Sequence, residues 1–246
     1  MIKYKIVVEY EGSQYHGWQR QKEVKTIQEE LEIALKKMVG SHISIFGASR
    51  TDSGVHAYGQ VAHFELKKPY HSSKIQSALN YYLKTQKISI VSVEQVSLMF
   101  HARFSSKMKT YVYKIINRKA PLTIHRKLAY HIKDNLNIER MREASTYLVG
   151  THDFTSFRTS GCQSNSPIKT IEELKILELN DQIHIKFVAR SFLYNQIRIM
   201  VGTLKIFGVK DINPKYMEQI ISSKNRSLAG PTAPSCGLYL HSINYN

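Results

Sequence analysis

The chain has 246 residues, which suits one large or two modest domains, and 42% of them are hydrophobic, enough for a real core. It carries 35 Lys and Arg against 19 Asp and Glu, a formal net charge of +16, which favours a polyanion such as nucleic acid as partner. No stretch approaches the roughly 20 apolar residues of a membrane span, and the N-terminal residues are too few and too polar for a secretory signal. We therefore expect a cytoplasmic protein without a membrane segment.

The cysteine and histidine patterns give no sign of a metal site. Cys162 and Cys236 are far apart and form no Cys-x-x-Cys pair, so free thiols in a reducing compartment are the simplest interpretation. The 11 histidines are scattered and contain no His-Glu-x-x-His pattern. We expect neither a metal nor a cofactor.

The first half of the chain alternates strand and helix patterns. Apolar residues at every second position predict a strand over 2–10. A polar aromatic loop follows. Trp18 is interpreted as a core residue, the loop as a surface that binds nucleic acid, or both together, with Trp18 as the anchor and Gln19, Arg20 and Gln21 facing out. Thr26 and Glu29 form a capping box for a helix that Gly40 ends. Further predicted elements are strands at 42–47, 58–66 and 88–93 and a helix at 72–83.

Asp52 lies in a turn-forming segment between the second and third of these strands. Asp, Ser and Gly tolerate tight or left-handed backbone, so the local sequence favours a plain turn with a structural Asp52. A carboxylate held between two strands can also act as an acid, a base or a nucleophile. The segment alone does not decide between these interpretations.

The second half repeats the alternation of strands and helices. A basic aromatic linker over 100–107 precedes a strand at 110–116 and a basic loop at 117–127, which contains Arg118, Lys119, Arg126 and Lys127. Helices are predicted at 137–148, at 192–206 and from Pro214, a hairpin at 171–189, and a closing strand that contains Leu238. The pattern predicts an α+β fold, with a sheet covered by helices. We place a domain boundary near residue 105, giving domains 1–105 and 106–246.

The segment around Asp52 reads Ser49-Arg50-Thr51-Asp52-Ser53-Gly54-Val55-His56-Ala57. This segment resembles the catalytic motif of the TruA family of tRNA pseudouridine synthases. The similarity extends over nearly the whole chain, through the blocks 10–21, 100–113, 150–158, 192–204 and 232–240. Ser49, Ser53 and Ser191 depart from the family, which usually has Gly, Ala and Gly there.

The resemblance implies the pseudouridine synthase fold, an α+β fold in which two α/β halves form a central mixed, mainly antiparallel sheet flanked by helices. It also implies a cofactor-free isomerase. Its implied substrate is uridine in the tRNA anticodon stem-loop, at tRNA positions 38, 39 and 40, with the target base flipped out of its stack. Asp52 would be the catalytic carboxylate, and the resemblance leaves two routes open for it, addition to the sugar or removal of the 2′ proton. The family also implies a homodimer with one tRNA spanning both subunits.

The same resemblance assigns roles to other residues. Arg50 would occupy the space that the flipped base leaves, and Leu238 would pack on the uracil. Tyr111 would stack on the uracil and help to remove its C5 proton, as a catalytic residue beside Asp52 and Arg198. By pattern alone, Tyr111 and Leu238 are equally well interpreted as core residues of strands. Arg198 would pair with Asp52, and its position on an apolar helix independently predicts an anionic partner. We expect Arg20, Arg103 and Lys107 to bind the substrate, whereas His56 and His63 are interpreted as structural.

Two alternatives to this function remain at the level of the sequence. The first is a non-catalytic RNA-binding or tRNA-folding protein on the same scaffold, which would have no need of Asp52, Tyr111 and Arg198 together. The second is a sister synthase with a different RNA target.

Overall fold

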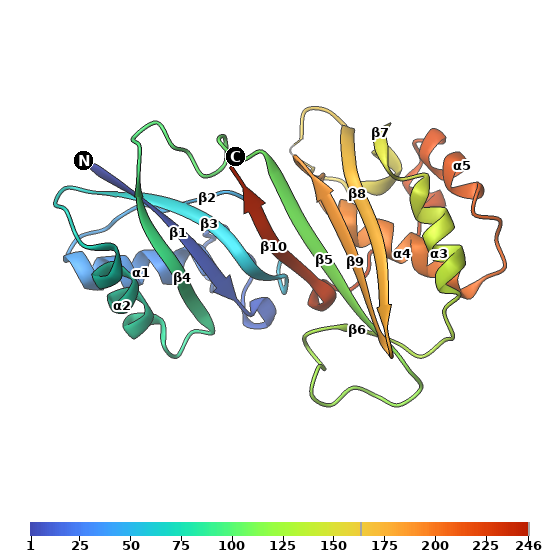
Figure 1. The fold of residues 1–246 in the computed structure, drawn as a ribbon, viewed down its shortest axis with the longest axis horizontal. Coiled ribbons are helices and arrows are strands. Elements are labelled where there is room, and N and C mark those ends of the chain that lie inside the picture. The colour runs from blue at the N-terminus through green and yellow to red at the C-terminus, as the bar shows by residue number, and fades with distance from the viewer. Residues whose placement is uncertain (163, 246) are drawn as a thin grey trace. The chain divides into compact units, whose positions relative to one another are not determined.

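The computed structural model describes residues 1–162 and 164–245 as an α+β fold, drawn in Figure 1. The chain divides into two compact units. The first contains Met1–Lys107 and the C-terminal residues from Tyr239 onward, and the second contains Met108–Leu238. The C-terminal strand thus belongs largely with the N-terminal residues.

The first unit is a sheet with two helices. Strand β1 pairs antiparallel with β3 and β4, short β2 pairs with β3, and β10 runs parallel to β3. Helix α1 packs on α2, and α2 packs on β4. The bounds are β1 (Ile2–Tyr10), α1 (Ile27–Val39), β2 (Phe46–Gly47), β3 (His56–Leu66), α2 (Ser72–Leu83), β4 (Ile88–Val96) and β10 (Leu238–Asn244).

The second unit is built around the antiparallel strand order β5-β9-β8-β7, with β6 parallel to β5. Helix α3 packs on α4 and on β8, and α5 lies against β7. The bounds are β5 (Met108–Asn117), β6 (Tyr130–Ile132), α3 (Ile138–Thr146), β7 (Gly150–Asp153), β8 (Ile168–Leu179), β9 (Gln182–Ala189), α4 (Gln196–Val209) and α5 (Tyr216–Ser222).

The predicted α+β class is confirmed, and so are the strongly periodic elements. Alternation in β1 buries Tyr4, Ile6 and Val8 completely on one face of the sheet, which is the source of the predicted strand. The hairpin turn falls at Asn180, whose positive φ of 56° suits a two-residue connection between β8 and β9. Gly40 ends α1 in the left-handed conformation, as predicted.

The predicted capping box at the start of α1 is wrong. Thr26 is the N-cap residue, but its side chain makes no capping bond, and its buried Oγ1 has no hydrogen-bond partner among the described residues. Two backbone carbonyls from the preceding loop act instead. Gly17 O accepts from Ile27 N at 3.2 Å, and Trp18 O accepts from Gln28 N at 3.0 Å. A tertiary contact therefore caps this helix where a local side chain was expected.

Other element bounds also differ from the prediction. The strand predicted at 42–47 shrinks to Phe46–Gly47, because only these residues pair with β3. The helix predicted from 192 begins at Gln196, because Asn195 takes a left-handed conformation with φ 60°. Helix α3 ends at Thr146, and Gly150 opens β7. No helix among the described residues is long and apolar enough to cross a membrane.

Candidate active site

The loop that carries Asp52 is fastened to β3 along its first half. Ala48 N donates to Val61 O at 2.8 Å. The fully buried Gln60 side chain donates through Nε2 to Ser49 O at 2.7 Å and accepts from Ser49 N at 3.3 Å. A buried amide that uses both of its ends in this way leaves the backbone before Asp52 little freedom.

Asp52 itself begins a tight turn, as the local sequence predicted. Val55 N donates to Asp52 O at 3.1 Å, and Gly54 in the turn has a φ of +78°. The Asp52 side chain is half-buried, whereas the preceding Thr51 is buried. Thr51 Oγ1 shares a 2.8 Å hydrogen bond with the Tyr10 hydroxyl at the end of β1. The carboxylate therefore sits beside a position that the sheet fixes.

The loop between β1 and α1 closes over this turn from the other side. Trp18 N donates to Thr51 O at 3.1 Å, and Gly54 N donates to Tyr15 O at 3.3 Å. Trp18 is only 2% exposed, which confirms the interpretation as a core residue. Ser53, one of the family departures, donates through Oγ to the same Tyr15 carbonyl at 3.2 Å. Because the carbonyls of Gly17 and Trp18 also cap α1, hydrogen bonds connect the helix, this loop and the Asp52 turn to one another.

Two glycines permit this close approach. A Cβ on Gly12 would lie 1.9 Å from Val55 O, and a Cβ on Gly17, whose φ is +89°, would lie 2.5 Å from Thr51 O. Both distances are far below an ordinary contact, so any larger residue must displace the Asp52 loop. Gly12 and Gly17 belong to the block 10–21 that resembles the TruA family, and the close approach of the two loops explains why glycine stands at both positions.

Arg50 and the three predicted substrate-binding cations also belong to the first unit. Arg50, Arg103 and Lys107 are exposed. Arg20 is exposed as well, but its Nη1 contacts Glu32 Oε2 at 3.1 Å, so part of its charge is compensated. The structure leaves the roles of these four residues as predictions.

Tyr111 and Arg198 lie in the second unit. Tyr111 is on β5, is 7% exposed, and meets the ring of Phe192 edge-on at 5.4 Å. Arg198, on α4, is half-buried and donates from Nε to Ala233 O at 2.8 Å and from Nη1 to Asn195 Oδ1 at 2.9 Å. The sequence argument that this guanidinium needs an anion is incomplete, because two neutral oxygens also accept from it.

Leu238 ends the second unit at the start of β10 and is 6% exposed. Its position is set by Tyr113, whose hydroxyl donates to Pro234 O at 2.6 Å and whose ring leaves no room for a Cβ at Gly237. The next residue, Tyr239, stacks on His56 at 4.7 Å within the first unit. His56 Nδ1 accepts from Gly12 N, which agrees with a structural role for this histidine.

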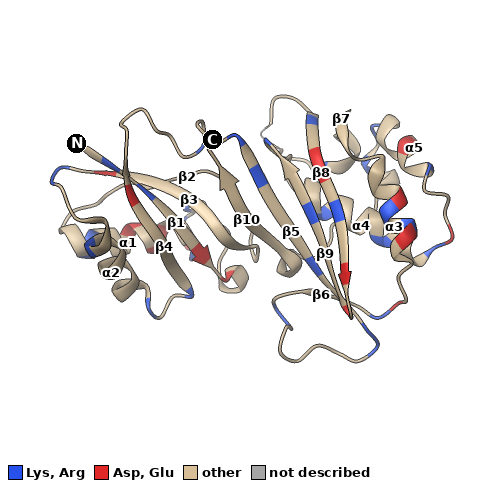
Figure 2. Ribbon diagram, in the orientation of Figure 1, with Lys and Arg blue, Asp and Glu red and all other residues tan. Residues whose placement is uncertain are grey.

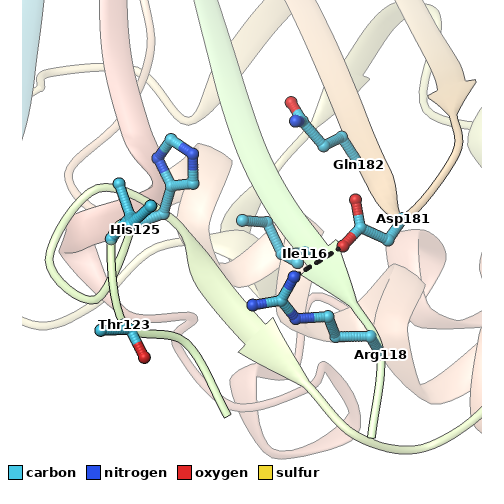
Figure 3. Close-up of a pocket in the computed structure, with 7 residues that line it drawn as sticks. Ile116, Arg118, Thr123, His125, Asp181 and Gln182 are labelled. Carbon is cyan, nitrogen blue, oxygen red and sulfur yellow. Dashed lines mark hydrogen bonds and ion pairs between the residues drawn. The ribbon is translucent and has the colours of Figure 1, made fainter. Parts of the chain in front are cut away.

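The second unit has a cavity apart from the predicted site residues. It measures about 280 Å³, and Figure 3 shows its labelled lining residues, with Arg118 directed at Asp181. The two form an ion pair of 3.2 Å, and Arg118 also donates to two carbonyls of its own loop. Its cation is thus engaged in holding the loop. Figure 2 shows further Lys and Arg along β5, β8 and β9.

Comparison with known proteins identifies the class to which this fold and loop belong. A family model described as tRNA pseudouridine synthase matches residues 6–105 and 144–246. The chain belongs to the tRNA pseudouridine synthase family, a family of isomerases.

Full-length relatives carry a more specific name. The chain is 49% identical over 245 residues to tRNA pseudouridine synthase A of Ehrlichia chaffeensis, covering 99% of this chain and 100% of that protein. Identity is 46% over 246 residues to the protein of that name from Anaplasma phagocytophilum and 44% over 245 residues to that from Wolbachia pipientis wMel, each with 99% and 100% coverage. The resemblance to the TruA family is thereby confirmed.

Proposed function

We propose that this chain converts uridine to pseudouridine in the anticodon stem-loop of tRNA, with Asp52 as the catalytic carboxylate. Family membership supports the reaction and tRNA as the class of substrate. The observation that carries the assignment of Asp52 is the double fastening of its loop. Gln60 holds it to β3, and the backbone of Tyr15 and Trp18 holds it to the capped end of α1. Such fixation is what a reacting group needs for orientation.

The proposed reaction rearranges one nucleoside without loss of atoms. The bond between C1′ and N1 breaks, the uracil turns, and C5 bonds to C1′. C5 then gives up its proton, and N1 gains one, so no redox partner or second substrate is required. Asp52 acts either by adding to C1′ or by removing the 2′ proton.

A paired uridine cannot reach a carboxylate in the loop, so the target base must leave its stack at a cost of a few kcal/mol. We propose that Arg50 enters the vacated space. It is exposed and stands two residues before Asp52, on the part of the loop that Gln60 fixes.

We propose that residues of the second unit receive the flipped base. The ring of Tyr111, which Phe192 contacts edge-on, would stack on the base, and Leu238 at the start of β10 would give the base an apolar contact. Leu238 directly precedes Tyr239, which stacks on His56 four residues beyond Asp52. Arg198 is held in place by Ala233 and Asn195, and we propose that it keeps Asp52 ionised.

The positive charge supports binding of tRNA through its phosphates. We propose that Arg103 and Lys107 contact the backbone, with Arg20 contributing less because Glu32 compensates it. The proposal includes a homodimer in the cytoplasm, as in the family resemblance, and a reaction without cofactor.

The decisive experiment compares Asp52→Asn with the wild-type protein on a tRNA transcript. We expect pseudouridine formation to fall to background while the affinity for tRNA stays within about twofold, because the two side chains have nearly the same shape. Asp134→Asn, at an exposed position of the second unit, is the matched control and retains activity. Mapping the modified nucleotides identifies the target. Turnover by Asp52→Asn would remove the proposed role of Asp52, and modification outside the anticodon stem-loop would establish a sister specificity.

A further inference from the structure

Four rings from separate parts of the chain form a continuous row in the first unit. Phe46 of β2 stacks on His63 of β3 with ring centroids 5.2 Å apart. His63 meets His101 at 4.7 Å, and His101 meets Phe104 at 4.4 Å. We call Phe46, His101 and Phe104 the aromatic platform, with His63 as its buried support.

The platform is open to solvent at both ends. Phe104 is 74% exposed and Phe46 is 52% exposed, whereas the supporting His63 is only 4% exposed. Leu98 and Met99, earlier in the same segment, are 57% and 89% exposed. Large apolar side chains gathered at a surface in this way mark a site of interaction.

Backbone hydrogen bonds hold the two histidine rings in place. Ala102 N donates to His63 Nδ1 at 3.2 Å, and Arg103 N donates to His101 Nδ1 at 3.2 Å. Both nitrogens therefore act as acceptors and carry no proton. Burial, with the nearby His101 and Lys3, lowers the pKa of His63 to about 4, and burial also lowers the pKa of His101. The row is thus rigid and uncharged near neutral pH.

Cations border the platform. The guanidinium of Arg103 lies 5.6 Å from the centre of the Phe104 ring, and Lys107 is exposed three residues further on. The segment 97–107 contains both cations and no Asp or Glu. An aromatic surface beside uncompensated cations is typical of proteins that bind unpaired nucleotides, because rings stack on bases and cations contact phosphates.

We propose that the aromatic platform stacks an unpaired nucleobase of the tRNA substrate other than the target uridine. This inference rests on the proposed function for the identity of the RNA. The platform lies at the β2 end of the Asp52 loop, where Phe46 pairs with His63, whereas His56, at the other end of the loop, is seven residues away along β3, about 23 Å at the usual rise per strand residue. A base stacked on the platform would hold the tRNA at a second position and so help to orient the target uridine at Asp52.

Charge argues against a second copy of this chain as the occupant. A twofold contact places the same surface of each copy against the other. Arg103 and Lys107 of both copies would then gather in one interface, to which the segment 97–107 contributes no carboxylate. The phosphates of a tRNA, by contrast, would be attracted to Arg103 and Lys107.

The test replaces Phe104 by Leu, which keeps an apolar side chain but removes the ring face. We expect tRNA affinity to fall roughly 5- to 30-fold and KM to rise, with kcat unchanged. Phe104→Tyr should restore binding, because it keeps a ring. The matched control is Tyr81→Leu, which removes a 64% exposed ring from α2, a helix that contributes no residue to the platform, and should bind tRNA like wild type.

The salt dependence of binding provides a second measurement. Phe104→Leu should leave the slope of log affinity against log salt unchanged, whereas Arg103→Ala should reduce it by about one. Wild-type affinity in Phe104→Leu, or a loss of self-association in sedimentation with unchanged tRNA binding, would overturn the platform. A wild-type protein that bound and modified no tRNA would overturn the proposed function and the platform's ligand together.

Discussion

Replacing Gly17 by Ala should misplace the Asp52 loop, and the structure allows the effect to be estimated. Gly17 has a φ of +89°, and the added Cβ would lie 2.5 Å from Thr51 O. An ordinary contact begins at 3.4 Å, so the loop must yield by about 0.9 Å. A displacement of about 1 Å near a reacting group can cost about a hundredfold in rate. We therefore expect kcat to fall roughly 10- to 100-fold.

The same molecule supplies a control for the backbone part of this effect. Gly40 has a φ of +81°, but a Cβ there would meet nothing within 4 Å. Gly40→Ala therefore carries only the cost of a left-handed non-glycine residue, about 1–2 kcal/mol of stability, and should keep its kcat. Gly17→Ala should lose a further 1–3 kcal/mol or so to the clash.

Two assays separate these contributions. Urea unfolding reports the stability of each variant, and single-turnover pseudouridine formation on a tRNA transcript, well below the unfolding transition, reports the chemical step. If Gly17→Ala turned over like wild type, or if Gly40→Ala lost as much activity, the fastening of the Asp52 loop would have no part in catalysis.

Two further predictions concern Arg198 and His63. In a double-mutant cycle of Arg198→Ala and Asp52→Asn, the changes in unfolding free energy should be non-additive by about 0.5–3 kcal/mol if the side chains pair; strict additivity would contradict the pairing. His63 has a folded-state pKa of about 4 against an ordinary 6.5, so the unfolded chain binds the extra proton first and stability is lost as pH falls through this range. Urea unfolding should show wild type losing about 1–2 kcal/mol between pH 7 and pH 5, and His63→Asn should lose clearly less; equal losses would exclude His63 as the cause.

The elements with a clear period were predictable because their signal is local. Alternation predicted β1 and the β8–β9 hairpin, and Gly40 indicated the end of α1. The start of α1 was predicted with the wrong cap, because the partners of Ile27 and Gln28 are carbonyls of a neighbouring loop. Short β6 and β7 were missed, because strands of three and four residues carry too little periodicity.

For the candidate site too, the sequence indicated which residues matter, and the structure gave the reason for some of them. Sequence resemblance indicated Asp52, Arg50 and the glycines around them, yet it gave no reason for Gly12 or Gly17. That reason lies in the approach of two loops, which only the folded backbone reveals. The pairing of Asp52 with Arg198 stays a prediction.

The sequence by itself determined the family, the class of reaction and the periodic elements, because each is written in residues close together along the chain or in motifs in a set order. Only the tertiary structure decided that β10 returns to the first unit beside β3, and that Phe46, His63, His101 and Phe104 form one row. Pairing between distant strands brings these residues together, and no local pattern encodes which strands will pair.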